Sequence, residues 1–80
     1  MPALELFGTA TCPATAEMRD WLDWKKREFV EYDVEADPEA YKKMLALTQG
    51  RHTVPVLAED GKVIQIGWQG RGCVVKSVTP

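Results

Sequence analysis

This sequence has few cysteines, one histidine and no long apolar run, and each of these features excludes a type of protein. Two cysteines among 80 residues cannot build a disulfide scaffold. One histidine and the lack of a Cys-x-x-Cys pair leave too few ligands for a zinc site supplied by the protein itself. No run of about 18 apolar residues is present, which excludes a membrane-spanning helix.

An excess of positive charge and a leader sequence are also missing. The net charge of −2 and the pI near 5.3 provide no basic field that would attract nucleic acid. The first residues lack the charged start and apolar run of a signal peptide, so we expect a cytoplasmic protein. Hydrophobic residues make up 45% of the chain, which is enough for the small core of one domain over residues 1–80.

Short segments with alternating apolar and polar residues are separated by segments with helical spacing. Strands are predicted at residues 3–7, 29–34, 54–58 and 63–66, and helices at residues 13–27 and 38–47. Pro13 and Pro38 suit the first turn of a helix, and the Asp60-Gly61 pair predicts a hairpin turn. Residues 73–78 have room only for a short terminal helix.

This order of elements predicts an α/β fold. A strand–helix–strand beginning requires a parallel pair of strands with a right-handed crossover. The hairpin near the end of the chain must be antiparallel. A four-stranded mixed sheet packed against helices follows.

Cys12 stands out because it lies where a strand and a loop of small residues give way to a helix. The N–H groups and the dipole of the first helical turn favour a thiolate at that place, which makes the sulfur nucleophilic. Thr15, three residues further on, is placed to donate a hydroxyl hydrogen bond to that sulfur. The alternative is that Cys12 is an inert packing residue or a helix cap, although Ser or Thr would cap better.

Three segments in order resemble the glutaredoxin family: Thr11-Cys12-Pro13-Ala14-Thr15, Gly50-Arg51-His52-Thr53-Val54-Pro55 and Asp60-Gly61-Lys62. The resemblance covers nearly the whole chain up to about Cys73 and implies a thioredoxin/glutaredoxin-like fold. It also implies that Cys12 is the nucleophile and that Pro55 is cis. Val54 would then pair, strand-fashion, with the main chain of a bound cysteinyl peptide.

The departures from the family are equally informative. Thr15 stands where dithiol members have a second cysteine, so the resemblance is to a monothiol Cys-Pro-x-Thr variant. Thr9 replaces a lysine that would contact a glutathione carboxylate. The Cys-Gly-Phe-Ser segment of cluster-carrying members is missing, and the C-terminal helix is short.

Cys73 follows Gly70-Arg71-Gly72, where many glutaredoxins bind the glutamyl end of glutathione. Three interpretations remain open for this segment. The backbone N–H groups and Arg71 hold an anion such as a carboxylate, the Cys73 thiol resolves a mixed disulfide on Cys12, or Cys73 is a small buried residue.

The resemblance assigns further residues to substrate or glutathione binding. These are Thr11, Pro13, Arg51, Thr53, Val54, Pro55, Trp68, Gly70, Arg71 and Gly72. A surface arginine is the plainer interpretation of Arg51, and we give His52 no catalytic role. Trp21 and Trp24 lie on one helix and are expected to cover the sheet edge, with a self-association patch as the alternative.

These observations predict a glutaredoxin-like thiol–disulfide oxidoreductase that reduces disulfides or glutathione mixed disulfides through Cys12. Its partners would be a disulfide-containing or glutathionylated protein, with glutathione or a reductase as electron donor, in electron transport and redox homeostasis. No tightly bound cofactor, metal, nucleic acid or membrane is expected. The alternatives are a redoxin that carries an iron–sulfur cluster or a metal, and a catalytically degenerate interaction domain.

Overall fold

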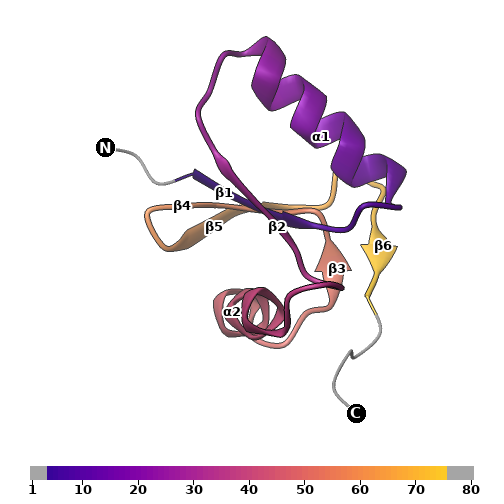
Figure 1. The fold of residues 1–80 in the computed structure, drawn as a ribbon, viewed down its shortest axis with the longest axis vertical. Coiled ribbons are helices and arrows are strands. Elements are labelled where there is room, and N and C mark those ends of the chain that lie inside the picture. The colour runs from indigo at the N-terminus through magenta and orange to yellow at the C-terminus, as the bar shows by residue number, and fades with distance from the viewer. Residues whose placement is uncertain (1–3, 76–80) are drawn as a thin grey trace.

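The computed structural model describes residues 4–75, which form a sheet between two helices (Figure 1). The elements in chain order are β1 (Leu4–Gly8), α1 (Pro13–Trp24), β2 (Val30–Asp33), α2 (Pro38–Thr48), β3 (Thr53–Val54), β4 (Val56–Glu59), β5 (Lys62–Ile66) and β6 (Cys73–Val74). Four strands form the main sheet in the order β2-β1-β4-β5. β1 pairs with β2 in parallel and with β4 antiparallel, which confirms the predicted mixed sheet.

The core lies on both faces of this sheet because side chains alternate along β1. Leu4 and Leu6 face α1 and pack with Met18 and Leu22. Phe7 faces α2, in a second cluster that includes residues of α2 and β3. One helix therefore covers each face, as Figure 1 shows.

The hairpin between β4 and β5 turns at the predicted dipeptide. Asp60 and Gly61 have φ angles of 53° and 80°, the pair of left-handed residues that a two-residue type I′ turn requires. The Asp-Gly sequence predicted this turn because few other residue pairs tolerate both angles.

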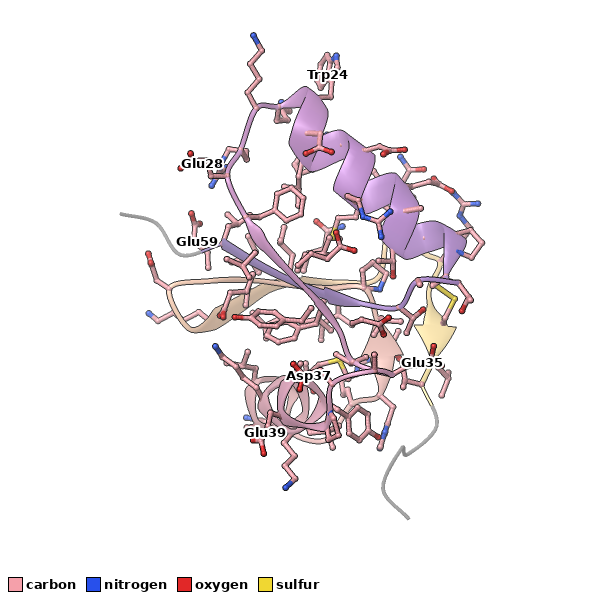
Figure 2. The ribbon with its side chains drawn as sticks, viewed as in Figure 1. Trp24, Glu28, Glu35, Asp37, Glu39 and Glu59 are labelled. Atoms are coloured by element: carbon pink, nitrogen blue, oxygen red, sulfur yellow. A yellow bond between two sulfur atoms is a disulfide. The ribbon has the colours of Figure 1, made fainter. Side chains whose placement is uncertain are left out.

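Helix α1 ends earlier than predicted. It stops at Trp24 rather than at residue 27, because Lys26 adopts a left-handed φ of 58°. The amide of Arg27 then donates to the Leu22 carbonyl at 3.0 Å, a pattern that satisfies carbonyls left free at a helix end. Trp24, predicted to cover the sheet edge, is 75% exposed and projects away from the fold at this end of α1 (Figure 2).

Two predictions about the second half of the chain were wrong. The strand predicted at residues 54–58 is divided at Pro55 into β3 and β4, which belong to different sheets. The short terminal helix expected from residue 73 is absent in the described part, where Cys73 and Val74 form β6 and pair antiparallel with β3. Residues 76–78 of that prediction lie outside the described residues.

Candidate functional site

Cys12 is the N-cap residue of α1, between the end of β1 and the first helical turn. Its backbone is extended (φ −84°, ψ 117°), and Pro13 follows as the first helical residue. The Cys12 carbonyl accepts the amide of Ala16 at 3.2 Å, while the side chain makes no capping hydrogen bond. The side chain is buried, with 2% of its surface exposed. Its sulfur therefore lies at the positive end of the helix without being used to cap it.

The Cys12 sulfur is joined to Cys73 in a disulfide. The two Cα atoms lie 6.1 Å apart although 61 positions separate the residues in the sequence, a normal distance for a disulfide. Of the three interpretations of Cys73, this bond favours the one in which the Cys73 thiol is the partner of Cys12. Cys73 is half-buried and belongs to β6.

Val54 and Pro55 form the wall of the site that faces Cys73. The Val54–Pro55 peptide bond is cis, as the resemblance implied, and both side chains are fully buried. In the antiparallel register, Val54 pairs with Cys73 and Thr53 pairs with Val74. The main chain of Val54 thus faces a cysteine, but this cysteine belongs to the chain itself.

Thr15 does not make the hydrogen bond that the sequence predicted. Its hydroxyl is completely buried and has no hydrogen-bond partner. The side chain instead packs against β1, where a Cβ atom on Gly8 would lie only 2.2 Å from Thr15 Cγ2. Because the Cys12 sulfur is bonded to Cys73, this structure contains no Cys12 thiolate to which a hydroxyl could donate.

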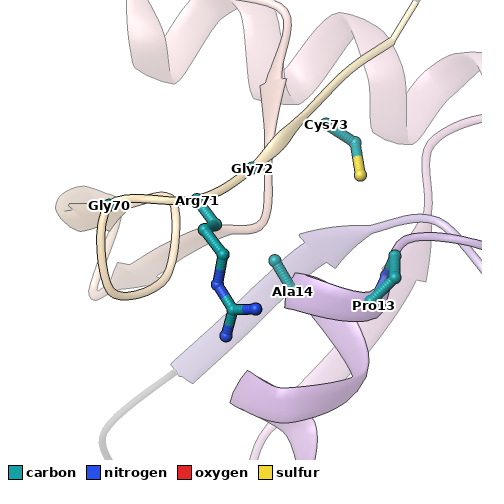
Figure 3. A pocket seen from close by; sticks show the side chains of 6 residues that line it. All are labelled: Pro13, Ala14, Gly70, Arg71, Gly72 and Cys73. Atoms are coloured by element: carbon teal, nitrogen blue, oxygen red, sulfur yellow. The ribbon is translucent and has the colours of Figure 1, made fainter.

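A cleft of about 390 Å³ is lined in part by Cys73, one of the two disulfide cysteines (Figure 3). Its lining residues come from the start of α1 and from the loop before β6: Pro13, Ala14, Gly70, Arg71, Gly72 and Cys73. The tertiary structure thus brings together five of the residues predicted from the sequence and adds Ala14. Thr11, Arg51, Thr53 and Trp68 do not line the cleft.

The predicted residues outside the cleft occupy several positions. Thr11 lies in the exposed loop before Cys12, and Thr53 is half-buried in β3. Arg51 is exposed, and its main chain is tied to the Thr48 hydroxyl by two hydrogen bonds of 3.0 and 3.1 Å. The neighbouring His52, which was given no catalytic role, is hydrogen-bonded through its Nδ1 to the Tyr41 hydroxyl.

Glu17, on the second turn of α1, was not identified from the sequence. Its Oε1 accepts a hydrogen bond from Arg71 at 2.7 Å and another from Trp68 Nε1 at 3.2 Å. The same carboxylate therefore fastens both ends of the loop before β6 to α1. No sequence signal could have identified it, because its partners lie more than 50 positions away.

Arg71 and Trp68 were both predicted to contact a ligand, but both side chains have partners within the chain. The Arg71 guanidinium is paired with Glu17, and the Arg71 amide donates to the Trp68 carbonyl at 2.9 Å. The Trp68 indole packs against Trp21, with ring centroids 5.5 Å apart. An anion in the cleft would have to compete with Glu17 for Arg71, and Trp68 contacts α1 rather than the cleft.

Within residues 4–75, no group of three or more His, Cys, Asp or Glu side chains is arranged to hold a metal ion. In the same part of the chain, no helix combines the length and the apolar character needed to cross a membrane.

Two comparisons with known proteins found similar sequences. The family model described as Glutaredoxin matches residues 4–64. A curated relative, a probable glutaredoxin from Synechocystis sp. (strain ATCC 27184 / PCC 6803 / Kazusa), is 36% identical over 52 residues, which are 65% of this chain and 48% of the relative. The aligned segment thus spans about half the length of that relative. The family match ends before Arg71 and Cys73.

Proposed function

The chain belongs to the glutaredoxin family, and from this we propose that it is a thiol–disulfide oxidoreductase in which Cys12 attacks the substrate and Cys73 resolves the product. The observation that carries the proposal is the Cys12–Cys73 disulfide at the N-terminus of α1. The family match supports the thioredoxin-like fold and the class of chemistry, while the disulfide supports the choice of the second thiol.

The first step is the attack of the Cys12 thiolate on a disulfide or a glutathionylated cysteine. One S–S bond of the substrate breaks, a mixed disulfide with Cys12 forms, and the electron pair leaves on the departing thiolate. The helix N-terminus favours the negative charge on Cys12 before attack. In the reduced protein, the candidate to donate a hydrogen bond to that charge is the Thr15 hydroxyl, which is buried without a partner in the oxidised structure.

The second step is the attack of the Cys73 thiolate on the Cys12 sulfur. The mixed disulfide breaks, the substrate leaves as a reduced thiol, and the Cys12–Cys73 bond forms. In the oxidised chain β6 pairs with β3 beside Cys12, so re-formation of this pairing returns the second sulfur to Cys12 as the substrate segment leaves. Two electrons from glutathione or a reductase then restore both thiols.

The substrates in this proposal are disulfide-containing or glutathionylated proteins, and glutathione is the proposed co-substrate. The cleft lined in part by Cys73 supports an anionic ligand such as a glutathione carboxylate, because Arg71 also lines it. Such a carboxylate would take the place of Glu17 on the Arg71 guanidinium. No tightly bound cofactor is needed for either step.

The test is to treat the fully reduced protein with glutathione disulfide and to map its products by mass spectrometry. The wild type should lose two thiols and form the Cys12–Cys73 bond, with glutathione released. Cys73→Ser should stop at a glutathione adduct on Cys12, and Cys12→Ser should lose turnover. A wild-type protein that keeps a stable glutathione adduct on Cys12 with Cys73 free would contradict the resolving role.

A second outcome would contradict the enzyme assignment itself. If Cys12 reacts no faster than Cys73, and neither the wild type nor Cys12→Ser speeds the glutathione-coupled reduction of a disulfide above the uncatalysed rate, the chain is an interaction domain. If the purified protein carries a chromophore that Cys12→Ser removes, the cluster-carrying alternative is favoured.

A further inference from the structure

Strand β6 fills the place that a substrate strand would need. In the proposed reaction, a substrate cysteine bonds to the Cys12 sulfur while its main chain lies against Val54. In the structure, Cys73 holds both positions, since its sulfur is bonded to Cys12 and its backbone pairs with Val54. The Val75 amide continues the ladder by donating to the His52 carbonyl at 2.8 Å. The oxidised chain is therefore arranged like a mixed disulfide with its own C-terminal segment.

We propose that β6 is an internal stand-in for the substrate, and that the site selects cysteinyl segments of proteins with the side-chain pattern of residues 72–75. That pattern is a very small residue before the cysteine and an aliphatic residue two positions after it. The inference rests on the proposed function, because it takes Cys12 as the nucleophile. The inference goes beyond the proposed function because it names a class of substrate, which is recognised by its side chains and not only by its main chain.

The small residue is required by the space around Gly72. A Cβ atom there would lie 2.8 Å from the carbonyl oxygen of Val54 and 2.9 Å from Thr53 Cγ2. Val54 is fully buried, so its main chain has little room to retreat. A larger side chain before the substrate cysteine would therefore push the strand off β3.

The aliphatic residue is required by the pocket that holds Val75. Val75 is 2% exposed and belongs to the same buried cluster as Phe7, Tyr41 and Val54. Val74 is 77% exposed, because successive residues of a strand point to opposite sides. A substrate with an aliphatic residue at the Val75 position gains the burial of that side chain. The identity of the residue at the Val74 position should have little effect on the reaction rate.

The strand can leave once its disulfide is reduced. β3 and β6 each contain two residues, and a ladder this short has little stability of its own. Reduction removes the covalent link to Cys12, and a protein segment with the same pattern can then pair with β3. Edge pairing of this kind gives affinity through the main chain and specificity through alternate side chains.

The test uses the full chain with Cys73→Ser and short, terminally blocked peptides carried as mixed disulfides with thionitrobenzoate. The Cys12 thiolate attacks the peptide sulfur, the probe S–S bond breaks, a Cys12–peptide S–S bond forms, and thionitrobenzoate leaves with the electron pair. Its absorbance gives the rate, and mass spectrometry confirms the peptide adduct. Each rate is divided by the rate of the same probe with free glutathione.

The peptide Gly-Cys-Val-Val should react about tenfold faster than Val-Cys-Val-Val or Gly-Cys-Val-Ser, because each change removes one required feature. Gly-Cys-Ser-Val is the matched control, since it places the same serine at the exposed position, and it should stay within about twofold of the first peptide. Equal rates for all four peptides would overturn this proposal and leave the Cys12 nucleophile intact. No thionitrobenzoate release from any peptide would overturn the proposed function as well.

Hydrogen exchange on the wild type tests the departure of β6 without any substitution. The Val75 amide should exchange at least about tenfold faster after reduction, while amides of β1 keep their protection. Unchanged protection of Val75 in the reduced protein would show that β6 does not vacate β3, which contradicts the proposal.

Discussion

Thr15 is the side chain whose environment differs most from the one expected of it. In the oxidised structure its hydroxyl is buried without a partner, and a buried hydroxyl without a hydrogen bond costs about 1–3 kcal/mol. The sequence places this hydroxyl near a sulfur, but the sulfur is bonded to Cys73. The hydroxyl is therefore unfavourable in the oxidised state, whereas the proposed function gives it a thiolate to donate to in the reduced state.

We predict that Thr15→Val stabilises the oxidised protein by about 1 kcal/mol, because valine has nearly the same shape and no hydroxyl to desolvate. The gain should be smaller in the reduced protein, and alkylation of Cys12 should slow, because the thiolate loses a donor. Urea unfolding in both redox states and alkylation rates measure the two effects. Thr15→Ser is the control, since it keeps the donor and only removes a methyl group. A loss of stability in oxidised Thr15→Val would contradict this account.

At the scale of elements, Glu17 links α1 to the loop that precedes β6. It accepts hydrogen bonds from Arg71 and from Trp68, and the loop lies between β5 and the second cysteine. Each partner is substantially exposed, so the ion pair contributes at most about 1 kcal/mol. Even a contribution of this size is relevant, because the ion pair helps to hold the loop before β6, and with it Cys73, close to Cys12.

We predict that Glu17→Gln lowers the equilibrium constant for closing the Cys12–Cys73 disulfide by about threefold against a glutathione redox buffer. Added salt should reduce the difference from the wild type, because it screens the exposed ion pair. Glu28→Gln is the matched control, since it removes the same charge from the connection between α1 and β2. Equal effects of both substitutions would show that the net charge, and not the contact, is responsible.

A second link at this scale joins β1, β2 and α2 through one carboxylate. Glu5 accepts hydrogen bonds from Lys43 Nζ at 2.6 Å and from the Tyr32 hydroxyl at 3.1 Å. The hydrogen bond to Glu5 raises the pKa of Lys43. Burial raises the pKa of Tyr32, and its hydrogen bond to Glu5 adds to the effect.

These shifts predict how the stability depends on pH. Both folded-state pKa values lie above those of the unfolded chain, so the unfolded chain loses these protons first as the pH rises. The stabilisation is therefore present below about pH 10 and declines as the pH rises through the folded-state values. Glu5→Gln should cost about 1 kcal/mol at pH 7, discounted for the exposure of Lys43, and the difference from the wild type should narrow at about pH 11. Urea unfolding at both pH values checks this, and a constant difference would contradict it.

At the scale of the whole molecule, the disulfide joins the two halves of a very small fold. It connects residues 61 positions apart, in a chain whose core is limited by its 80 residues. Closing so long a loop removes much of the conformational freedom of the unfolded chain. The redox state of the site and the stability of the fold are therefore coupled.

We predict that reduction lowers the free energy of unfolding by about 2–4 kcal/mol. Urea unfolding of the oxidised protein, with and without a reductant, gives the difference. Cys73→Ser should unfold like the reduced wild type and should not respond to the reductant. Coincident unfolding curves for oxidised and reduced protein would contradict the expected coupling.

Local sequence signals determined most of the secondary structure and one end of the site. The proline after Cys12 sets the start of α1, and Asp60-Gly61 sets the hairpin, because these preferences depend on a few neighbouring dihedral angles. Alternation over residues 3–7 predicted the strand β1, and the structure then showed that its two faces pack against different helices. The family resemblance then identified Cys12 and Pro55 without any knowledge of distances.

Only the tertiary structure decided what Cys12 faces. Whether Cys73 resolves, binds an anion or packs could not be read from the sequence, since it depends on a distance across 61 positions. The sequence near Cys73 suggested a helix, but pairing with β3 gave its backbone groups partners outside their own segment. The same reason hid Glu17, whose importance comes from two residues at the other end of the chain. Local preferences act over a few residues, whereas contacts between distant segments exist only after the chain has folded.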